Sequence, residues 1–339
     1  MTDTDIAVVA DGLRKRFGDT EALRGVSFEI PRATVLCVLG PNGAGKTTAV
    51  RILTTLLRPD AGRGLIDGID VIAEPRRARA RIGLTGQYAA VDERLTGFEN
   101  LLLVGRLFHM RKAAAAIRAT ELLERFGLDD AAGRVVKGYS GGMRRRLDIA
   151  MSLIARPSVL FLDEPTTGLD PRSRLEMWDV IDGLVTDGTT LLLTTQYLDE
   201  AERLAHNIVV IDHGEVIARG TDAELKERSG GASVTITLND ATDLPRVREL
   251  LDDLVPAGAV ESIDAEAGTV SVPVTRADHV VPSVVRALDG AGIDVLDVAA
   301  HEPTLDDVFL QLTGQPSGAD SESTAGAGHG ADDPEGRHR

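Results

Sequence analysis

The chain has 339 residues, with 53 acidic and 37 basic side chains, which gives a formal net charge of −16. This acidic balance argues against a general binder of nucleic acid or of anionic membranes, because such partners require a basic surface. The length suits one large α/β domain followed by a smaller domain. The single cysteine, Cys37, excludes an internal disulfide bond and is predicted to be a buried core residue.

The first residues, Met1 to Ile6, are polar and acidic, and they do not have the pattern of a signal peptide. No apolar run approaches the roughly 20 residues that a membrane helix needs. We therefore expect a soluble, cytoplasmic chain, and any membrane process that it serves must rely on another chain.

Residues 6 to about 228 alternate short apolar strands with helical stretches, which is typical of α/β architecture. Between about residues 95 and 155 the apolar residues instead recur at helical spacing, so we predict a helical subdomain inserted into the α/β core. The predicted strands of the core are Val26–Ile30, Thr34–Leu39, Val159–Leu162, Thr190–Thr194 and Ile208–Ile211.

A glycine-rich segment joins the strand Thr34–Leu39 to a predicted helix, Ala49–Leu57, and fits the phosphate-binding pattern G-x-x-x-x-G-K-[ST]. Its glycines let backbone N–H groups point at phosphates, and the helix N-terminus adds a partial positive charge. Lys46 is expected to reach the β- and γ-phosphates of ATP, and the Thr47 hydroxyl is expected to ligate Mg²⁺. The predicted nucleotide-binding residues are Gly40, Pro41, Asn42, Gly43, Ala44, Gly45, Lys46, Thr47 and Thr48.

Two adjacent acids, Asp163 and Glu164, follow the apolar strand Val159–Leu162. Asp163 is placed to hold Mg²⁺, and Glu164 is placed to polarise the attacking water as general base. Adjacent acids are also common at a solvated strand end. In a chain that carries a phosphate-binding loop, however, the pair predicts nucleotide hydrolysis.

The C-terminal region begins after Ser229–Gly231, which marks a predicted domain boundary. The segments that follow read as strand, helix, strand, strand, helix and strand, which predicts a small ferredoxin-like α+β domain over 229–314. The six segments are Ser233–Leu238, Leu244–Leu254, Val260–Ile263, Thr269–Val274, Ala277–Leu288 and Ile293–Val298.

A last helix is predicted over Leu305–Leu312, with one apolar face made by Leu305, Val308, Phe309 and Leu312. This face either completes the core of the small domain or contacts a partner chain. Residues 315–339 contain nothing apolar that is larger than alanine, so this tail is expected to be disordered.

Tyr139-Ser140-Gly141-Gly142-Met143 resembles the signature of ABC ATPases, whose usual form is Leu-Ser-Gly-Gly-Gln. Pro165 to Asp170 is similar to the D-loop of that family, Gln87 matches its Q-loop, and Phe17 falls where an aromatic ring stacks on adenine. The resemblance covers residues 6 to about 228 and implies a P-loop NTPase core that hydrolyses ATP with Mg²⁺. It adds contacts to ATP from Phe17, Ser140, Gly141, Gly142 and Asp170, a catalytic role for Gln87, and a metal site made by Thr47, Gln87 and Asp163.

Ser140 to Gly142 opens a predicted helix, so the Ser140 hydroxyl and the free N–H groups form a second anion site. In ABC ATPases the signature of one subunit closes over the ATP held by the other. One phosphate loop and one signature per chain therefore imply a homodimer with two identical sites. ATP binding would close this dimer and hydrolysis would open it.

Gln196 departs from the usual ABC pattern, in which a histidine after this strand contacts the γ-phosphate. A glutamine amide can donate a hydrogen bond to phosphate but carries no charge. We count Gln196 among the catalytic residues and expect slow turnover.

Four segments, 87–93, 139–148, 194–201 and 305–314, look like those of the daunorubicin/doxorubicin-resistance type of antibiotic exporter ATPase, in which glutamine at position 196 is usual. The resemblance implies a peripheral subunit on the cytoplasmic face of a bacterial membrane. It would power export of a hydrophobic small molecule through a separate integral membrane permease, with no nucleic-acid partner. Residues Tyr88–Asn100 are the predicted docking surface for the permease.

Two alternatives remain open from the sequence. The first is an ABC ATPase that exports lipid or polysaccharide, and the second is a soluble ABC protein of DNA repair or translation. A further choice concerns the basic run Arg144–Arg146, which is either a solvated helix face or pairs with acids of a partner subunit or of the Gln87 loop.

Overall fold

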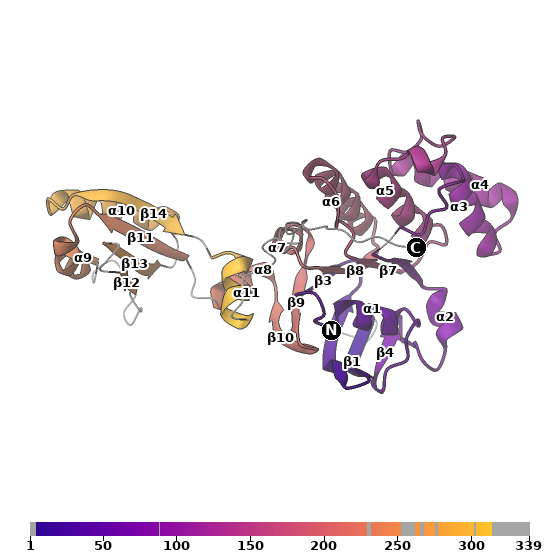
Figure 1. The fold of residues 1–339 in the computed structure, drawn as a ribbon, viewed down its shortest axis with the longest axis horizontal. Helices are drawn as coiled ribbons and strands as arrows, with labels where there is room; N and C mark the ends of the chain where they lie inside the picture. Colours follow the sequence, from indigo (N-terminus) through magenta and orange to yellow (C-terminus); the bar gives the residue numbers. More distant parts are fainter. Residues whose placement is uncertain are drawn as a thin grey trace, which may run out of the picture.

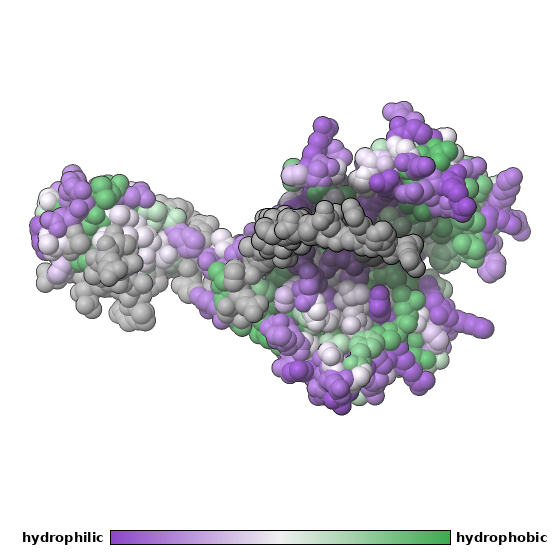
Figure 2. Space-filling model, viewed as in Figure 1, coloured by the Kyte–Doolittle hydropathy of each residue, from purple (hydrophilic) through white to green (hydrophobic). Residues whose placement is uncertain are grey.

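The computed structural model describes residues 5–87, 89–228, 232–251, 262–264, 268–274, 277–301 and 303–313. A large body holds the N-terminal two thirds of the chain, and a small sheet lies apart from it (Figure 1). The space-filling view shows the same separation (Figure 2). The predictions for Ser229–Gly231, Tyr88, residues 252–254 and 260–261, and the tail 315–339 concern positions outside the described residues.

The body is built around a six-stranded sheet in the order β10-β9-β3-β8-β7-β6. All its neighbouring strands are parallel except β10, which pairs antiparallel with β9. Every residue of β3, β7 and β8 is buried, as a parallel sheet covered on both faces requires. The strands are β3 (Val35–Leu39), β6 (Ile82–Thr85), β7 (Val159–Asp163), β8 (Thr190–Thr195), β9 (Asn207–Asp212) and β10 (Glu215–Gly220).

A second, antiparallel sheet has the order β2-β1-β4-β5. It consists of β1 (Ile6–Phe17), β2 (Thr20–Pro31), β4 (Ala61–Ile66) and β5 (Ile69–Asp70). The sequence pattern predicted only the Val26–Ile30 part of it, because register shifts between β1 and β2 interrupt the alternation of apolar residues. Helix α1 (Lys46–Leu53) contacts strands of both sheets. It begins earlier than the predicted Ala49–Leu57, because the left-handed Gly45 stands at its N-cap, and it ends earlier, with Thr54 at its C-cap.

The predicted helical segment is present as α3 (Gly97–Leu107), α4 (Lys112–Arg125), a short 3-10 turn η1 (Val136–Gly138) and α5 (Gly141–Ser152). Thr96 and Glu99 form a capping box that fixes the start of α3. The three helices pack on one another through a shared core that contains Leu101, Leu122 and Leu147. The other helices of the body are α2 (Pro75–Arg79), α6 (Pro171–Thr186), α7 (Leu198–Leu204) and α8 (Asp222–Arg228).

The small domain follows the ferredoxin-like order of elements that the sequence predicts. Its antiparallel sheet has the order β12-β13-β11-β14 and a core of its own that includes Val234, Ile236, Val272 and Leu288. The elements are β11 (Ala232–Leu238), the 3-10 turn η2 (Ala241–Asp243), α9 (Leu244–Leu251), β12 (Ser262–Asp264), β13 (Thr269–Val274), α10 (Ala277–Gly290) and β14 (Val295–His301).

The last helix, α11 (Leu305–Thr313), returns to the body and packs against α7 and α8 (Figure 1). Leu305, Val308 and Phe309 are buried in the core of the body and not in that of the small domain. Both interpretations of these three residues, a core position in the small domain and a contact with a partner chain, are therefore wrong, because the body of the same chain covers them. Leu312, which the pattern placed on the same face, is 43% exposed. The small sheet is consequently tethered to the body at both of its ends.

Among the described helices, none combines the length and the apolar character that crossing a bilayer demands. Cys37 is completely buried in the middle of β3, which confirms its prediction as a core residue.

Candidate functional site

The phosphate loop connects β3 to α1 and is shaped by glycine. Gly45 has a φ of 111°, and a Cβ there would lie 2.5 Å from the carbonyl oxygen of Ala22, so only glycine fits. The loop brings the start of α1 to the carboxyl end of the parallel sheet, where open α/β sheets place their ligands. The N–H groups in the first turn of α1 have no partner within the helix, which suits them to phosphate oxygens.

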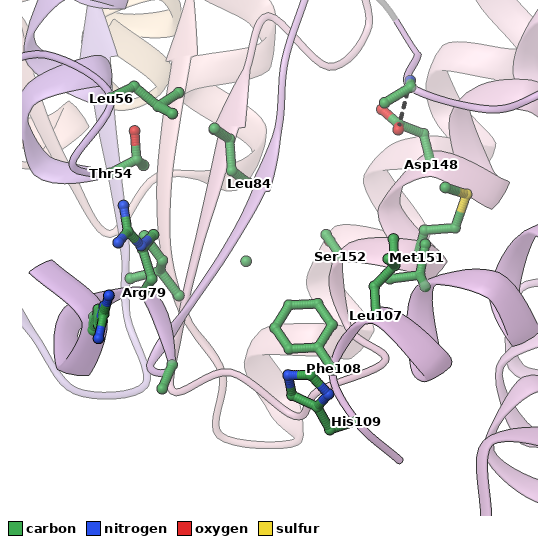
Figure 3. Close-up of a pocket in the computed structure, with 16 residues that line it drawn as sticks. Thr54, Leu56, Arg79, Leu84, Leu107, Phe108, His109, Asp148, Met151 and Ser152 are labelled. Carbon is green, nitrogen blue, oxygen red and sulfur yellow. Dashed lines mark hydrogen bonds between the residues drawn. The ribbon is translucent and has the colours of Figure 1, made fainter. Parts of the chain in front are cut away.

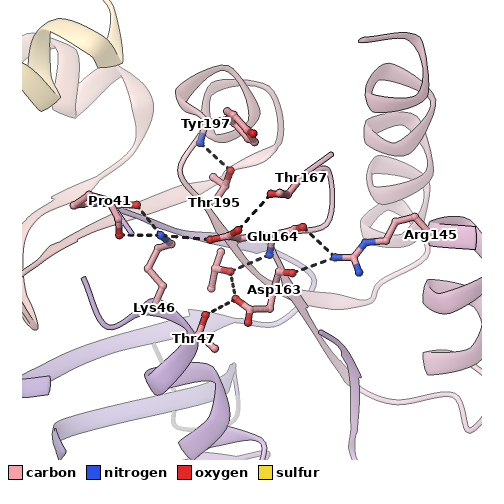
Figure 4. Close-up of polar contacts among 11 residues, drawn as sticks. Pro41, Lys46, Thr47, Arg145, Asp163, Glu164, Thr167, Thr195 and Tyr197 are labelled. Atoms are coloured by element: carbon pink, nitrogen blue, oxygen red, sulfur yellow. Dashed lines mark hydrogen bonds and ion pairs between the residues drawn. The ribbon is translucent and has the colours of Figure 1, made fainter. Parts of the chain in front are cut away.

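Lys46 is only 4% exposed and folds back over the loop. Its Nζ donates to the carbonyl oxygens of Gly40 at 2.7 Å and Pro41 at 3.1 Å, and it lies 3.7 Å from Oε1 of Glu164 (Figure 4). Burial lowers the pKa of Lys46, while the nearby carboxylates of Glu164 and Asp163 oppose that shift. The ammonium thus stands between the phosphate loop and the predicted base.

Asp163 ends β7 and faces the first turn of α1. Its Oδ1 accepts hydrogen bonds from the hydroxyls of Thr47 at 3.2 Å and Thr194 at 2.5 Å (Figure 4). Mg²⁺ at nucleotide sites takes one or two protein oxygens together with phosphate oxygens. The Thr47 hydroxyl and the Asp163 carboxylate, already in contact, fit that ligand set. Thr194 was not predicted, because a threonine inside a buried strand carries no signal of its own.

Glu164 follows Asp163 in a left-handed backbone conformation, with a φ of 50°. Its N–H donates to the carbonyl oxygen and to the hydroxyl of Thr194, both at 3.1 Å. Its Oε2 accepts from the Thr167 hydroxyl at 3.3 Å, and the residue is 8% exposed. The carboxylate is therefore held on the same side of the sheet as Lys46, where a general base for a phosphate-directed water is required.

The basic run Arg144–Arg146 divides into three different environments. Arg145 is buried, and its guanidinium reaches the carbonyl groups next to Asp163 and Glu164 (Figure 4). Arg144 lies 3.9 Å from Glu93 in the segment after Gln87, and Arg146 lies 3.8 Å from Glu176. The sequence left the role of this run open. The contact between Arg144 and Glu93 agrees with the interpretation that involves the Gln87 loop.

The signature residues stand at the start of α5. Ser140 is its N-cap and accepts a hydrogen bond from the Met143 N–H at 3.2 Å. Ser140 and Gly141 are exposed, whereas Gly142 is buried. A Cβ on Gly142 would lie 2.9 Å from the Ser173 hydroxyl, while one on Gly141 would meet nothing closer than 3.8 Å. The open side of this helix end is therefore at Ser140 and Gly141.

The remaining predicted site residues lie where strands end or where a helix begins. Gln87 is exposed and directly follows Gly86, and Gln196 is half-buried just beyond β8. Asp170 is the exposed N-cap of α6 and accepts from the N–H and the hydroxyl of Ser173 at 3.0 and 2.6 Å. Phe17 is 50% exposed at the end of β1, with the Lys15 Nζ 5.7 Å from its ring centre. Thus the fold brings Lys46, Thr47, Asp163 and Glu164 together beside the phosphate loop.

Comparison with known proteins gives matches along nearly the whole chain. Residues 23–167 match the ABC transporter family model, and residues 220–313 match the model of the C-terminal domain of DrrA1-3-like ATP-binding proteins. The chain is 54% identical to the daunorubicin resistance ATP-binding protein DrrA3 of Streptomyces coeruleorubidus, over 91% of this chain and 96% of that protein. It is 47% identical to the doxorubicin resistance ATP-binding protein DrrA of Mycobacterium tuberculosis, over 94% of this chain and 96% of that protein.

A solved structure of a dimeric ATP-binding cassette, in a post-hydrolysis state with ADP and phosphate, superposes on the body. Its TM-score is 0.57 at 26% identity, and the match covers 63% of this chain and 98% of the cassette.

Proposed function

We propose, from the premise that this chain belongs to the ATP-binding proteins of ABC transporters, that it powers export of a hydrophobic, drug-like molecule. Members of this family hydrolyse ATP, couple the hydrolysis to transport and work with a membrane permease. The observation that carries the proposal is the cluster of buried Lys46, Asp163 and Glu164 with half-buried Thr47 at the phosphate loop. The resistance proteins that are 47 to 54% identical support a drug as cargo.

The residues of the cluster divide the chemistry among them. Bound ATP with Mg²⁺ supplies the phosphoryl group that is transferred to water. Thr47 and Asp163 would hold the metal, and Lys46 would turn from its two carbonyl partners toward the β- and γ-phosphates. Glu164 would orient the attacking water and accept its proton. Gln196, Gln87 and Phe17 would contact the γ-phosphate, the metal and the adenine, respectively.

A homodimer of this chain would complete each site. Ser140 and Gly141 present a hydroxyl and the N–H groups of a helix start on an exposed surface, where they can meet the phosphates held by a second copy. Asp170, exposed at the start of α6, would lie at the same interface. The dimeric cassette with ADP and phosphate supports this arrangement.

The permease would dock in a groove beside the helical segment, and this contact would hold the chain at the cytoplasmic face of the membrane. A cavity of about 630 Å³ lies there, with Leu56 and Leu84 on one side and Leu107, Phe108 and Met151 on the other (Figure 3). Leu107 is 68% exposed and Phe108 is 48% exposed, so the groove offers apolar surface for a cytoplasmic segment of a membrane protein. Of the predicted docking segment Tyr88–Asn100, Ala90 lines this groove.

The two domains would have different functions. We assign ATP chemistry to residues 1–228, including the helical part at about 95–155, and regulation or assembly to residues 229–314. The family model that matches residues 220–313, from just before α8 to the end of α11, supports treating the small sheet and its two anchoring helices as one unit.

The test is transport in inside-out membrane vesicles that contain the chain and its co-purified permease. We expect ATP-dependent uptake of daunorubicin, and no uptake when the chain carries Glu164→Gln. Uptake of a lipid or polysaccharide and not of the drug would contradict the proposed drug cargo and support the alternative of a lipid or polysaccharide exporter. Failure of the chain to co-purify with any polytopic membrane protein would contradict the transport assignment.

A further inference from the structure

Arg145 occupies a place in the site that neither the phosphate loop nor the signature explains. It belongs to α5, the helix that the signature opens, yet its side chain is 6% exposed and points into the body (Figure 4). Its Nε donates to the Pro165 carbonyl at 2.8 Å, and its Nη2 donates to the carbonyls of Asp163 and Glu164, both at 3.1 Å. One guanidinium thus holds three consecutive carbonyl groups.

These carbonyls need such a donor because the chain leaves the sheet at this point. Glu164 adopts a left-handed φ of 50°, a conformation that a residue with a side chain keeps only when its surroundings enforce it. Buried carbonyl groups without donors are costly, and a planar guanidinium with five N–H groups can serve several of them at once. Lysine has one compact ammonium and cannot reproduce that fork.

The same guanidinium also holds the loop that carries Gln87. Its Nη1 donates to the Gly86 carbonyl at 2.5 Å and lies 3.5 Å from Oδ2 of Asp148. Asp148, one turn further along α5, accepts a hydrogen bond from the Ala90 N–H at 2.9 Å. Both ends of the segment from Gly86 to Ala90 are therefore fastened to α5.

We propose that Arg145 is a positioning residue that holds Glu164 in its working conformation and links it to the helix opened by the signature. The inference rests on the proposed role of Glu164 as general base. Ser140 and Arg145 are five residues apart, which is about 7 to 8 Å along the helix axis at roughly 1.5 Å per residue. When the signature contacts the nucleotide of a second subunit, α5 and Arg145 thereby pass the resulting displacement to Glu164. Glu164 acts on the nucleotide that this chain itself binds.

The test compares Arg145→Gln with Arg144→Gln in the full-length chain. Both remove one positive charge from adjacent positions of α5, but Arg144 is 35% exposed and holds none of these carbonyls. We expect Arg145→Gln to lower kcat about 10- to 100-fold, because displacement of a catalytic group by ~1 Å has a cost of that size. The Kd for ATP should stay close to wild type, since Lys46 and the phosphate loop are untouched. Arg144→Gln should change neither quantity.

Amide hydrogen exchange without nucleotide gives a second readout that does not depend on hydrolysis. Arg145→Gln should speed exchange in peptides that cover residues 163–167 and 86–90, and Arg144→Gln, whose acidic neighbour Glu93 lies beyond the second segment, should leave both at the wild-type rate. If Arg145→Gln does not fold, Arg145→Lys keeps the charge and should show the same changes to a smaller extent.

A double variant separates this inference from the assignment of the base. In a Glu164→Gln background, Arg145→Gln should cause no further loss of residual turnover, because it acts through the group already removed. Three results would overturn the proposal for Arg145. The first is a double variant whose loss of turnover equals the product of the two single losses. The others are an exchange pattern unchanged by Arg145→Gln, and a fall in ATP affinity as large as the fall in kcat. Normal hydrolysis by Glu164→Gln alone would instead refute the role of Glu164, and the exchange result would still decide whether Arg145 holds the segment.

Discussion

At the phosphate-loop end of the site, Lys46 and Glu164 are 4% and 8% exposed, and each already has partners within the chain. At the signature end, Ser140 and Gly141 are exposed, and the Ser140 hydroxyl caps its own helix. One chain therefore preorganises the groups that act on the phosphate, and it leaves the surface that must close over the phosphate open to solvent. Changes at the two ends should consequently fail in different ways.

The largest effect is expected from Lys46→Ala. Removal of the ammonium that lies beside the loop carbonyls and Glu164 should reduce ATP turnover by more than about 100-fold, the usual cost of losing a group that stabilises developing charge. Turnover is measured as phosphate release by the purified chain, with Lys112→Ala, an exposed residue on α4, as the control. Wild-type turnover in Lys46→Ala would contradict the phosphate-loop assignment.

Glu164→Gln should separate hydrolysis from closure. The change is isosteric and removes only the base, so we expect turnover to fall about 10²- to 10⁴-fold while ATP still binds. With Mg²⁺ and ATP the variant should accumulate as a dimer in size-exclusion chromatography. A variant that remains monomeric and hydrolyses ATP normally would show that the preorganised end lacks the role assigned to it.

Two neighbouring glycines test the open end directly. Gly141→Ala places a methyl group on the exposed start of α5, so the melting temperature of the chain should stay at the wild-type value. The variant should no longer dimerise with ATP, and its turnover should fall about 10- to 100-fold. Gly142→Ala places its Cβ 2.9 Å from the Ser173 hydroxyl and should cost about 1–3 kcal/mol of stability through overpacking.

Thermal melting and ATP-dependent dimerisation, measured on both variants, separate these effects. Gly183→Ala is the matched control, since a Cβ there meets nothing within 4 Å. Equal loss of melting temperature in both variants would mean that the two glycines do not differ in the way that the structure implies.

A substitution far from both the phosphate loop and the signature should alter stability and leave ATP turnover unchanged. Phe309 is 6% exposed where α11 enters the body, so Phe309→Ala should cost about 3–5 kcal/mol of unfolding free energy. The turnover of the folded fraction should remain near wild type. Leu310, on the same helix but 41% exposed, provides the control Leu310→Ala. An unchanged denaturation midpoint in Phe309→Ala would contradict the packing of α11 on the body.

The sequence predicted those parts of the molecule whose signal is local. The phosphate loop, the buried strands that precede it and Asp163, and the order of elements in the small domain all follow from short patterns of glycine and apolar residues. The full length of β1 and β2 could not be predicted, because their register shifts break the alternation that marks a strand.

Two other features depend on tertiary neighbours. The run of three arginines gives no indication of which one is buried, since only the rotation of α5 relative to residues 163–165 brings Arg145 to their carbonyl groups. The apolar face of α11 indicates burial but does not identify the surface that covers it. Thr194 was missed for the same reason, because its hydrogen bond to Asp163 joins residues about 30 positions apart.

The return of α11 to the body has a consequence for the order in which the protein can be made. Leu305, Val308 and Phe309 complete a core whose other members lie before residue 229, yet they are translated only after the small domain. At roughly 5–20 residues per second, the ~80 residues between α8 and Phe309 delay this step by about 4–16 s. During that interval, while the chain is still on the ribosome, the apolar surface of α7 and α8 is not yet covered by α11. A chain released before Phe309 would leave the ATPase body with a permanent gap in its core.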